Sequence, residues 1–507
     1  MHIVKRFRLL YLAPVLAMIA LMAWALASPL GASPDDDFHL VSIWCGDGVR
    51  AGICEPGTSA GDRLVPEALK DASSCYAHRP AVSAACQQDT FDLDPTPSVV
   101  TARGNFAGAY PPVYYAVMGV FVTPDILGSA VLMRILNAVI FVGLVTALFA
   151  LLPRARRPAL IWGWLVTTIP LGLFLIASNN PSSWAITGVG TAWIALLGYL
   201  ETEGRRSVAL GAIFVTATVM AAGSRGDSAL YAGLAILVVL VLTFRWERQF
   251  ALRAILPIVM AVIAGVLFLS SRQTQSGLNG FGGSAGTVGT VGTAGTVTAA
   301  ADPLSAIVSN LLNIPSLWAG VLGYWGLGWI DTGMPAVVTF GAIACFVAVV
   351  FAGLAVMWGR KAIVLVAVGL VLWLLPAWVL YRGGDSVGQE VQPRYLLPLI
   401  VMFAGLAVLG LGTRGIRLNL TQRVLIVGTL SFVQLIALYV NMRRYIQGDG
   451  GGGWNLDQDP QWWWSIVVSP MFVLIIGSAA FAALTWILVR EVSGHRMAAL
   501  PASTVEG

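Results

Sequence analysis

Apolar runs of about 20 residues recur along this chain, and no other feature constrains its fold as strongly. A helix needs a run of about that length to cross a hydrocarbon core ~30 Å thick. Hydrophobic residues make up 57% of the 507-residue sequence and charged residues only 11%, unlike the composition of soluble domains. The sequence therefore predicts an all-α integral membrane protein with about twelve transmembrane helices. We expect these helices near residues 9–30, 127–152, 159–177, 182–200, 207–222, 228–244, 253–270, 334–357, 362–381, 394–412, 423–441 and 466–490.

The basic residues indicate how the chain is oriented in the membrane. Clusters of arginine and lysine fall in alternate loops, and an excess of such residues is typical of cytoplasmic loops. This pattern predicts that both termini are cytoplasmic and that every aspartate, from Asp35 to Asp459, lies outside. Few lysines against abundant arginine, alanine and glycine favour a bacterial source, and therefore the bacterial plasma membrane. The net charge of +5 comes from dispersed loop residues, so it indicates no nucleic-acid partner.

The first apolar run has a second interpretation. It could be a signal peptide that is cleaved after Ala25-Leu26-Ala27, so that the mature chain would lack the first helix. The run is long for a signal peptide, which favours a retained transmembrane helix. The acidic cluster that follows stays in the chain under both interpretations.

Four of the five cysteines lie in the first outer loop, while Cys345 lies in a predicted span. A polar loop in an oxidising compartment is commonly held together by disulfides. A zinc site is the alternative, but the spacings C-x8-C and C-x10-C are not typical of metal ligands. The sequence therefore predicts disulfides and leaves their pairing open. The four residues are Cys45, Cys54, Cys75 and Cys86.

The chain divides into transmembrane blocks separated by two large outer segments. A Gly/Thr/Val tract in the second segment predicts a mobile linker or lid. The expected regions are a first transmembrane helix (1–30), an outer loop with the acidic cluster, the cysteines and an interfacial helix (31–126), a six-helix block (127–270), a Gly-rich outer loop with an amphipathic segment (271–333), a five-helix block (334–490) and a cytoplasmic tail (491–507).

The strongest indication of chemistry is the run Pro34-Asp35-Asp36-Asp37-Phe38-His39, directly after the first span. Adjacent carboxylates repel one another, so such a run is normally solvated, bound to a metal or paired with a cationic group. The alternative is a helix N-terminus, where acidic residues are favourable, with a short helix starting near Phe38. Asp37 is expected to be a solvated neighbour.

Several segments resemble one family of bacterial polytopic membrane proteins, domain of unknown function 2142. The resemblance covers most of the chain in order, with two departures: Asp35-Asp36 replaces the family's usual Asp-Glu, and Tyr110 replaces a histidine. The second departure removes a residue that could carry a proton or bind a metal. The segments are Pro34-Asp35-Asp36-x-x-His39, Pro111-Pro112-x-Tyr114-Tyr115, Asn180-Pro181, Trp325-Gly-x-Gly-x-x-Asp331-Thr332 and Arg394-Tyr395-Leu-Leu-Pro398.

That family in turn is similar to the polytopic GT-C glycosyltransferases. The similarity implies that an acidic residue of the first outer loop acts as catalytic base or metal ligand, and that a polyprenyl phosphate carries the sugar. It implies catalytic roles for Asp35, Asp36 and His39, with Mg²⁺ or Mn²⁺ on the two aspartates. The remaining candidates are expected to bind substrate: Tyr114, Tyr115, Arg225, Asp331, Arg382, Arg394 and Tyr395.

The same chemistry follows from first principles. Sugar transfer from a lipid phosphate needs a base for the acceptor hydroxyl and cationic groups for the departing phosphate. Arginines bind phosphate through paired hydrogen bonds. Each candidate also has a structural interpretation: Arg225 could pair with Asp227 at the surface, and Arg394 could extend toward the membrane surface. Asp331 and Tyr115 could simply shape a turn and an interfacial packing contact.

The sequence leaves three classes of function open. The favoured one is a membrane glycosyltransferase that modifies an envelope glycan or glycolipid on the outer face. A transporter or flippase for lipid-linked sugars is the second, but ion-coupled transporters place ionisable residues at the membrane midplane, and no Asp, Glu, Lys or His is expected deep in a span. The third is a non-catalytic partner in envelope assembly.

Overall fold

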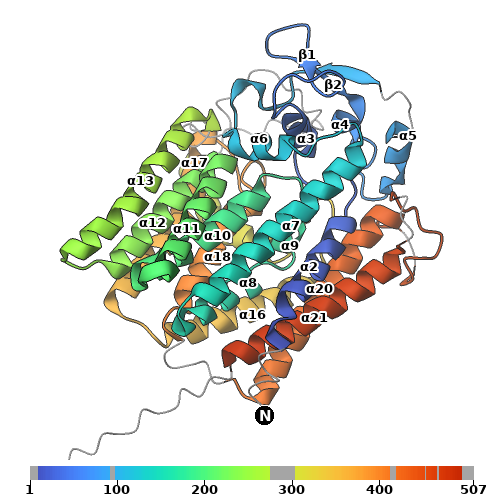
Figure 1. The fold of residues 1–507 in the computed structure, drawn as a ribbon. Helices are drawn as coiled ribbons and strands as arrows, with labels where there is room; N and C mark the ends of the chain where they lie inside the picture. The colour runs from blue at the N-terminus through green and yellow to red at the C-terminus, as the bar shows by residue number, and fades with distance from the viewer. Residues whose placement is uncertain are drawn as a thin grey trace, which may run out of the picture.

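The computed structural model describes residues 9–91, 97–273, 303–411, 418–450, 453–464 and 468–493, and most of these are helical. Figure 1 shows long helices packed side by side, with short helices and strands gathered at one end of the bundle. We call that gathering, residues 27–91 and 97–125, the cap. It lies over what we call the capped end of the bundle.

Ten helices in the described part of the chain are long and apolar enough to cross a membrane, which confirms the predicted class of fold. Two shorter apolar helices, α2 (Ala13–Leu26) and α18 (Pro393–Ala407), lie where two further spans are predicted. The ten are α7 (Ile126–Leu151), α10 (Ser182–Glu201), α11 (Gly204–Ser224), α12 (Gly226–Thr243), α13 (Arg248–Ser270), α15 (Pro303–Val321), α16 (Ala336–Leu354), α17 (Gly359–Gly383), α20 (Leu420–Gln447) and α21 (Pro470–Ser493).

The predicted span at 159–177 is wrong as a continuous helix. The structure divides it into α8 (Arg157–Leu165) and α9 (Leu171–Ile176), and α9 starts directly after Pro170. Proline cannot donate a backbone hydrogen bond, so a helix rarely continues through it. Every residue of α9 is buried, and irregular backbone at membrane depth is tolerated where protein surrounds it.

Helix α15 differs from the prediction in the opposite direction. Its sequence suggested an amphipathic stretch within an outer loop, whereas the structure forms a helix of transmembrane length. Two indole groups join it to α17: Trp318 donates to the carbonyl of Leu372 at 3.2 Å, and Trp373 to that of Leu311 at 3.0 Å. The predicted linker from 277 to 301 lies outside the described residues.

Helix α10 forms the centre of the bundle, because all of its residues from Ser182 to Gly198 are buried. It packs closely against α11 at Gly188, where a Cβ atom would come within 2.6 Å of the carbonyl oxygen of Ala217. Small residues allow this approach, and they are common where membrane helices touch. Close packing at α10 holds the surrounding helices at fixed positions beneath the cap.

The cap combines short helices with a small antiparallel sheet that the sequence did not predict. In the sheet, strand β2 lies between β1 and β3, and Leu64 is opposite Val100. Disulfides join Cys45 to Cys54 and Cys75 to Cys86, which confirms the predicted bonding and decides the pairing. The elements are α3 (Asp36–Trp44), β1 (Glu55–Pro56), β2 (Arg63–Pro66), α4 (Glu67–Asp71), η1 (Ala84–Gln87), α5 (Gln88–Phe91), β3 (Ser98–Thr101), η2 (Asn105–Ala107) and α6 (Val113–Gly119).

Basic side chains gather at the opposite end, which we call the basic end. Arg156, in η3 (Arg154–Arg156), forms an ion pair with Glu201 at 2.7 Å. Arg253 donates to the carbonyl of Tyr199 at 2.8 Å, and Arg360 to that of Phe244 at 2.7 Å. These contacts join the ends of neighbouring helices, so the alternating basic loops of the sequence meet at one end of the bundle.

Candidate functional site

One buried arginine fixes the chain where it leaves the first helix. Arg134 projects from α7 and donates to the carbonyls of Ala25, Ser28 and Pro29 at 2.8, 2.6 and 2.8 Å. The last carbonyls of a helix have no partner within it, and the guanidinium group supplies several donors in a fixed fork. Arg134 therefore terminates α2 and determines the path of the residues that lead to the acidic cluster.

Three more side chains continue this support. Tyr76 comes from the cap, Trp329 from the turn before α16 and Asn180 from just before α10. Distant parts of the chain therefore converge on one short segment. Because every donor is a side chain held elsewhere, the segment has little freedom to move. Tyr76 donates to the carbonyl of Leu30 at 2.7 Å, Trp329 to that of Gly31 at 3.0 Å and Asn180 to that of Pro34 at 2.8 Å.

The supported segment ends at Asp35, whose backbone is left-handed with φ of 58° and ψ of 24°. Aspartate is one of the few residues other than glycine that adopts this conformation readily. Asp35 occupies the N-cap position of α3, but its carboxylate makes no capping hydrogen bond. Its side chain is 40% exposed and is therefore accessible from solvent.

The three consecutive carboxylates do not all meet at one partner: Asp35 and Asp37 share Arg103, whereas Asp36 faces a backbone N–H. Asp35 pairs with Arg394 of α18 at 2.5 Å and with Arg103 of the cap at 3.7 Å. Asp37 also pairs with Arg103, so it is not the solvated neighbour that the sequence suggested. Asp36 turns inward, where it accepts a hydrogen bond from the backbone N–H of Ser33 at 3.1 Å. The carboxylates are therefore distributed among cationic and backbone groups and do not converge.

Their environments give the neighbouring carboxyl groups of Asp35 and Asp36 very different pKa values. Burial raises the pKa of Asp36 to about 7, although the charge of Arg134 and the N–H of Ser33 act in the opposite direction. Burial also acts to raise the pKa of Asp35, but the charge and hydrogen bond of Arg394, with a smaller contribution from Arg103, lower it to about 2. Asp35 is therefore an ionised, accessible carboxylate, whereas Asp36 is a buried group that holds its proton near neutral pH.

Two arginines face one tyrosine beside Asp35. The guanidinium carbon of Arg394 lies 5.1 Å from the ring centre of Tyr395, and that of Arg225 lies 4.6 Å from it. Both side chains are nearly buried. The alternative pairing of Arg225 with Asp227 does form but is not at the surface, and the alternative extension of Arg394 toward the membrane surface is not observed. Arg225 is also held by Asp227 through bonds of 2.9 and 2.8 Å.

Each of these arginines has one N–H donor that makes no hydrogen bond in the described part of the chain. Within the described residues, Nη1 of Arg225 and Nε of Arg394 are buried and have no hydrogen-bond partner. Buried donors without acceptors cost free energy, so such a place favours a ligand that supplies acceptor oxygens.

A histidine–tyrosine pair completes the site. His39 is fully buried, and its Nδ1 lies 2.9 Å from the hydroxyl of Tyr115 on α6. Burial lowers the pKa of His39 well below its ordinary value, so the ring is neutral. Tyr110 lies edge-on to His39 at 5.3 Å and beneath Arg225 at 5.7 Å. Burial raises the pKa of Tyr110 to about 12, so it contributes a protonated hydroxyl to the site.

The other predicted site residues lie in different surroundings. Tyr114 is fully buried and packs edge-on against Trp184 at 5.4 Å. Asp331 forms a buried ion pair with Arg444 at 2.8 Å. Arg382 lies over the ring of Trp378 at 5.6 Å. The structure thus brings together Asp35, His39, Tyr115, Arg225, Arg394 and Tyr395.

Arg103 is the functional candidate that the sequence did not indicate. It lies in a loop of the cap, and its guanidinium group bridges Asp35 and Asp37. No motif or span end marks it, because its position depends on how the cap folds over α3.

The described residues contain no group of three or more His, Cys, Asp or Glu side chains placed to hold a metal ion. Asp36 keeps one carboxylate oxygen without a partner, but it is fully buried. Asp35 is the accessible carboxylate of the pair, so a metal at this site would meet one protein carboxylate and complete its shell with other oxygens, as Mg²⁺ commonly does with water and phosphate.

The comparisons with known proteins identify the family. No curated protein and no solved structure matches the chain. A family model described as a predicted membrane protein, DUF2142, matches residues 18–403, which include every residue of the site. The match covers well over half of the chain, which therefore belongs to the DUF2142 family of predicted membrane proteins.

Proposed function

We propose that this protein is a membrane glycosyltransferase of GT-C type that moves a sugar from a polyprenyl phosphate to an envelope glycan or glycolipid. The observation that carries the proposal is the pairing of an accessible carboxylate with two nearly buried arginines. Asp35 is 40% exposed and contacts Arg394 at 2.5 Å, while Arg394 and Arg225 share the ring of Tyr395. A base beside a phosphate-binding pair is what sugar transfer from a lipid phosphate requires.

The arginines supply the phosphate site. The unpartnered N–H groups of Arg225 and Arg394 offer hydrogen bonds to phosphate oxygens, and their charges stabilise the phosphate as it leaves. Neutral donors nearby, the hydroxyl of Tyr110 among them, can hold the sugar without adding charge. The donor phosphate would therefore lie between α11 and α18 at the capped end.

Asp35 is the proposed base. The acceptor hydroxyl oxygen bonds to the anomeric carbon, the bond from that carbon to the phosphate oxygen breaks, and the hydroxyl proton passes to the carboxylate. At a pKa of about 2 the free carboxylate is a weak base. A phosphate on Arg394 offsets the charge that lowers this pKa, so donor binding would make Asp35 a stronger base. Asp35 would hold Mg²⁺ or Mn²⁺, whose charge would help to stabilise the phosphate as it leaves, and sugar transfer with and without metal tests that role.

The proposal places the cap on the outer face of a bacterial plasma membrane, with both termini in the cytoplasm. Two disulfides support an oxidising compartment for the cap. The gathering of arginines at the opposite end supports a cytoplasmic location for that end. Lipid-linked sugars would then reach the site from the outer leaflet.

The direct test is sugar transfer by the purified protein in nanodiscs. Radiolabelled polyprenyl-phosphate sugars are supplied with an envelope lipid extract as acceptor, with Mg²⁺, with Mn²⁺ and with EDTA. We expect Asp35→Asn to reduce transfer by about 10²- to 10⁴-fold, the usual contribution of a general base. Arg394→Lys should also reduce transfer, because lysine cannot form the paired hydrogen bonds of guanidinium.

Asp89→Asn is the matched control, because Asp89 is an exposed carboxylate of the same cap. It should transfer sugar as the wild type does. Equal losses in Asp35→Asn and Asp89→Asn would contradict the assignment of the base. Movement of the labelled lipid across the bilayer without transfer to any acceptor would favour the transporter instead.

A further inference from the structure

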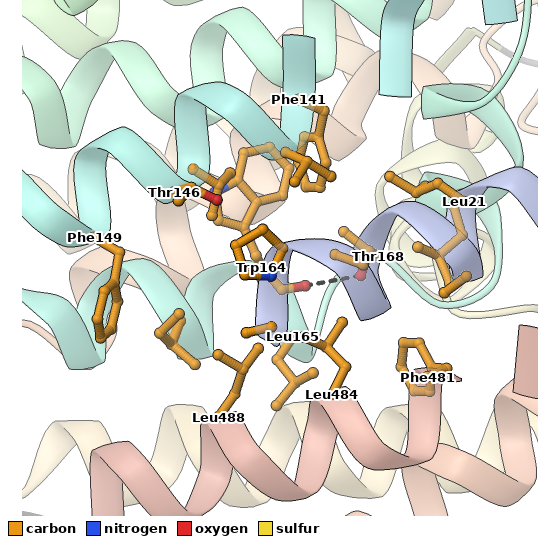
Figure 2. Close-up of a pocket in the computed structure, with 18 of the residues that line it drawn as sticks. Leu21, Phe141, Thr146, Phe149, Trp164, Leu165, Thr168, Phe481, Leu484 and Leu488 are labelled. Carbon is orange, nitrogen blue, oxygen red and sulfur yellow. Dashed lines mark hydrogen bonds between the residues drawn. The ribbon is translucent and has the colours of Figure 1, made fainter. Parts of the chain in front are cut away.

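An apolar cavity of about 150 Å³ lies in the half of the bundle away from the cap. Its walls come from α2, α7, α8, α9 and α21, and Figure 2 shows mostly hydrocarbon side chains around it. A cavity of about this volume with apolar walls stays dry and accepts hydrocarbon groups such as benzene. Hydrocarbon from the surrounding bilayer is therefore the natural occupant.

The cavity runs along the membrane helices toward the basic end. In Figure 2, Phe149 and Leu488 mark one end, while Leu21 and Phe481 mark the other. Phe149 lies two residues before the end of α7, which reaches the basic end of the bundle. A chain that enters beside Phe149 would therefore come from the leaflet at the basic end.

Three side chains with polar groups, Thr146, Trp164 and Thr168, line this apolar space. The indole of Trp164 lines the cavity, is only 6% exposed, and its Nε1 has no hydrogen-bond partner in the described part of the chain. Thr168, another lining residue, already donates to the backbone carbonyl of Trp164 at 3.0 Å. An occupant with an acceptor oxygen would satisfy the indole, which a pure hydrocarbon would not.

A cationic group lies at the mouth. The guanidinium carbon of Arg157 is 4.6 Å from the ring centre of Phe149, and its Nε is buried and unpartnered among the described residues. Among the neighbouring charges, that of Arg154 acts most strongly on Arg157, followed by the opposite charge of Glu491 and then by that of Arg206. The net field at this mouth is positive, so it favours an anionic group.

We propose that this cavity binds one anionic phospholipid, with the first few methylene groups of an acyl chain inside, an ester carbonyl on Trp164 Nε1 and the phosphate at Arg157. Arg157 and Trp164 are two turns apart on one face of α8, about 10 Å along its axis. That order, cation at the surface and neutral donor deeper, matches the order of phosphate and ester in a phospholipid. Basic pockets between membrane helices bind anionic headgroups in the same way.

The test compares two lipids with the same acyl chains, dioleoyl-phosphatidylglycerol and dioleoyl-phosphatidylcholine. Native mass spectrometry of the full chain in detergent counts the bound lipid at increasing concentration. We expect one phosphatidylglycerol to bind about fivefold more tightly than phosphatidylcholine, corresponding to about 1 kcal/mol per basic residue. Arg157→Gln should remove this preference, and Ala17→Phe, which places a ring in the cavity, should weaken binding of both lipids.

Two controls separate this site from the general lipid shell. Arg245→Gln removes an exposed charge at the same end, and Val15→Phe adds a ring on an exposed face of α2; both should bind as the wild type does. Trp164→Phe removes the indole N–H together with one ring, so it enlarges the apolar space but should still weaken binding of both lipids, because the hydrogen bond to the ester is lost. Equal affinity for the two lipids, or a preference that survives Arg157→Gln, would overturn the proposal. Binding is counted without any sugar donor, so the result does not depend on glycosyl transfer.

Discussion

Two Asp–Arg pairs with buried arginines lie at the capped end of the bundle, and their carboxylates differ in exposure. Arg394 and Arg444 have side chains that are 2% and 3% exposed, so the two cations are equally buried. Their carboxylates differ, because Asp331 is 6% exposed and Asp35 is 40% exposed. The two pairs are therefore distinguished by access of solvent to the carboxylate, and this access is why we propose a reactive role for Asp35 and a structural one for Asp331.

We call Asp331–Arg444 the closed pair and Asp35–Arg394 the open pair. In the closed pair, both side chains also bind other groups of the protein. Asp331 also accepts from the backbone N–H of His78 at 3.1 Å, and Arg444 donates to the carbonyls of Tyr76 and Val82, each at 2.8 Å. Asp35, in contrast, leaves part of its carboxylate open to solvent beside the two arginines that face Tyr395. The same residue types thus stabilise the cap at one place and form a candidate reaction site at the other.

The largest expected effect is the loss of the closed pair. Asp331→Asn leaves Arg444 buried without its counter-charge, and removing one partner of a buried pair costs about 3–5 kcal/mol. Thermal unfolding of the purified protein in detergent should show this loss, whereas Asp35→Asn serves as the comparison. If the two variants had equal stability, exposure would not be what distinguishes the pairs.

The buried neighbour of Asp35 should make stability depend on pH. The pKa of Asp36 is raised from 3.8 to about 7, so between these values the folded chain binds a proton that the unfolded chain has released. Raising the pH through this window therefore lowers the free energy of unfolding, by an amount on the order of a few kcal/mol. Above about pH 7 this contribution is constant.

Asp36→Asn isolates that contribution. The amide cannot ionise, so the difference in stability between variant and wild type should grow from pH 4 to pH 7 in favour of the variant. Unfolding midpoints measured across this range give the result directly. A difference that is flat with pH would show that Asp36 titrates as it does in the unfolded chain.

A smaller effect is expected from the disulfide next to the closed pair. The Cys75–Cys86 bond closes the loop that carries Tyr76, His78 and Val82, and replacing both cysteines by serine should cost about 2–3 kcal/mol. That loop supplies hydrogen-bond partners of Arg444. The stability costs of removing the disulfide and of Asp331→Asn should therefore be less than additive when the two changes are combined. A double-mutant cycle measures the coupling. Full additivity would mean that the loop and the pair act independently.

The smallest effect on stability is expected at the open pair. Asp35→Asn removes an interaction that solvent already screens, so the free energy of unfolding should change by less than about 1 kcal/mol. Unfolding in detergent measures this, and Asp89→Asn gives the background for a cap carboxylate. A cost as large as that of Asp331→Asn would assign Asp35 a structural role and remove the distinction drawn above.

Prediction from sequence succeeded where the evidence is local. The length of each apolar run indicated most of the membrane helices, and the cysteine spacing argued against zinc. It failed at 159–177, where the residues read as one apolar run but form two helices, one on each side of Pro170. It also missed the ion pairs of Arg103 with Asp35 and Asp37, because no local pattern around Arg103 indicates contact with those residues.

By itself, the sequence determined the membrane class, the approximate span positions and the acidic run after the first helix, because hydrophobic length and residue spacing are properties of neighbouring residues. Only the tertiary structure decided which carboxylate is exposed and which cation it meets. Asp35 and Arg394 are separated by 359 positions, and their contact depends on the packing of α18 beneath the cap. Charge pairing at such distances is set by the arrangement of helices and not by any local pattern.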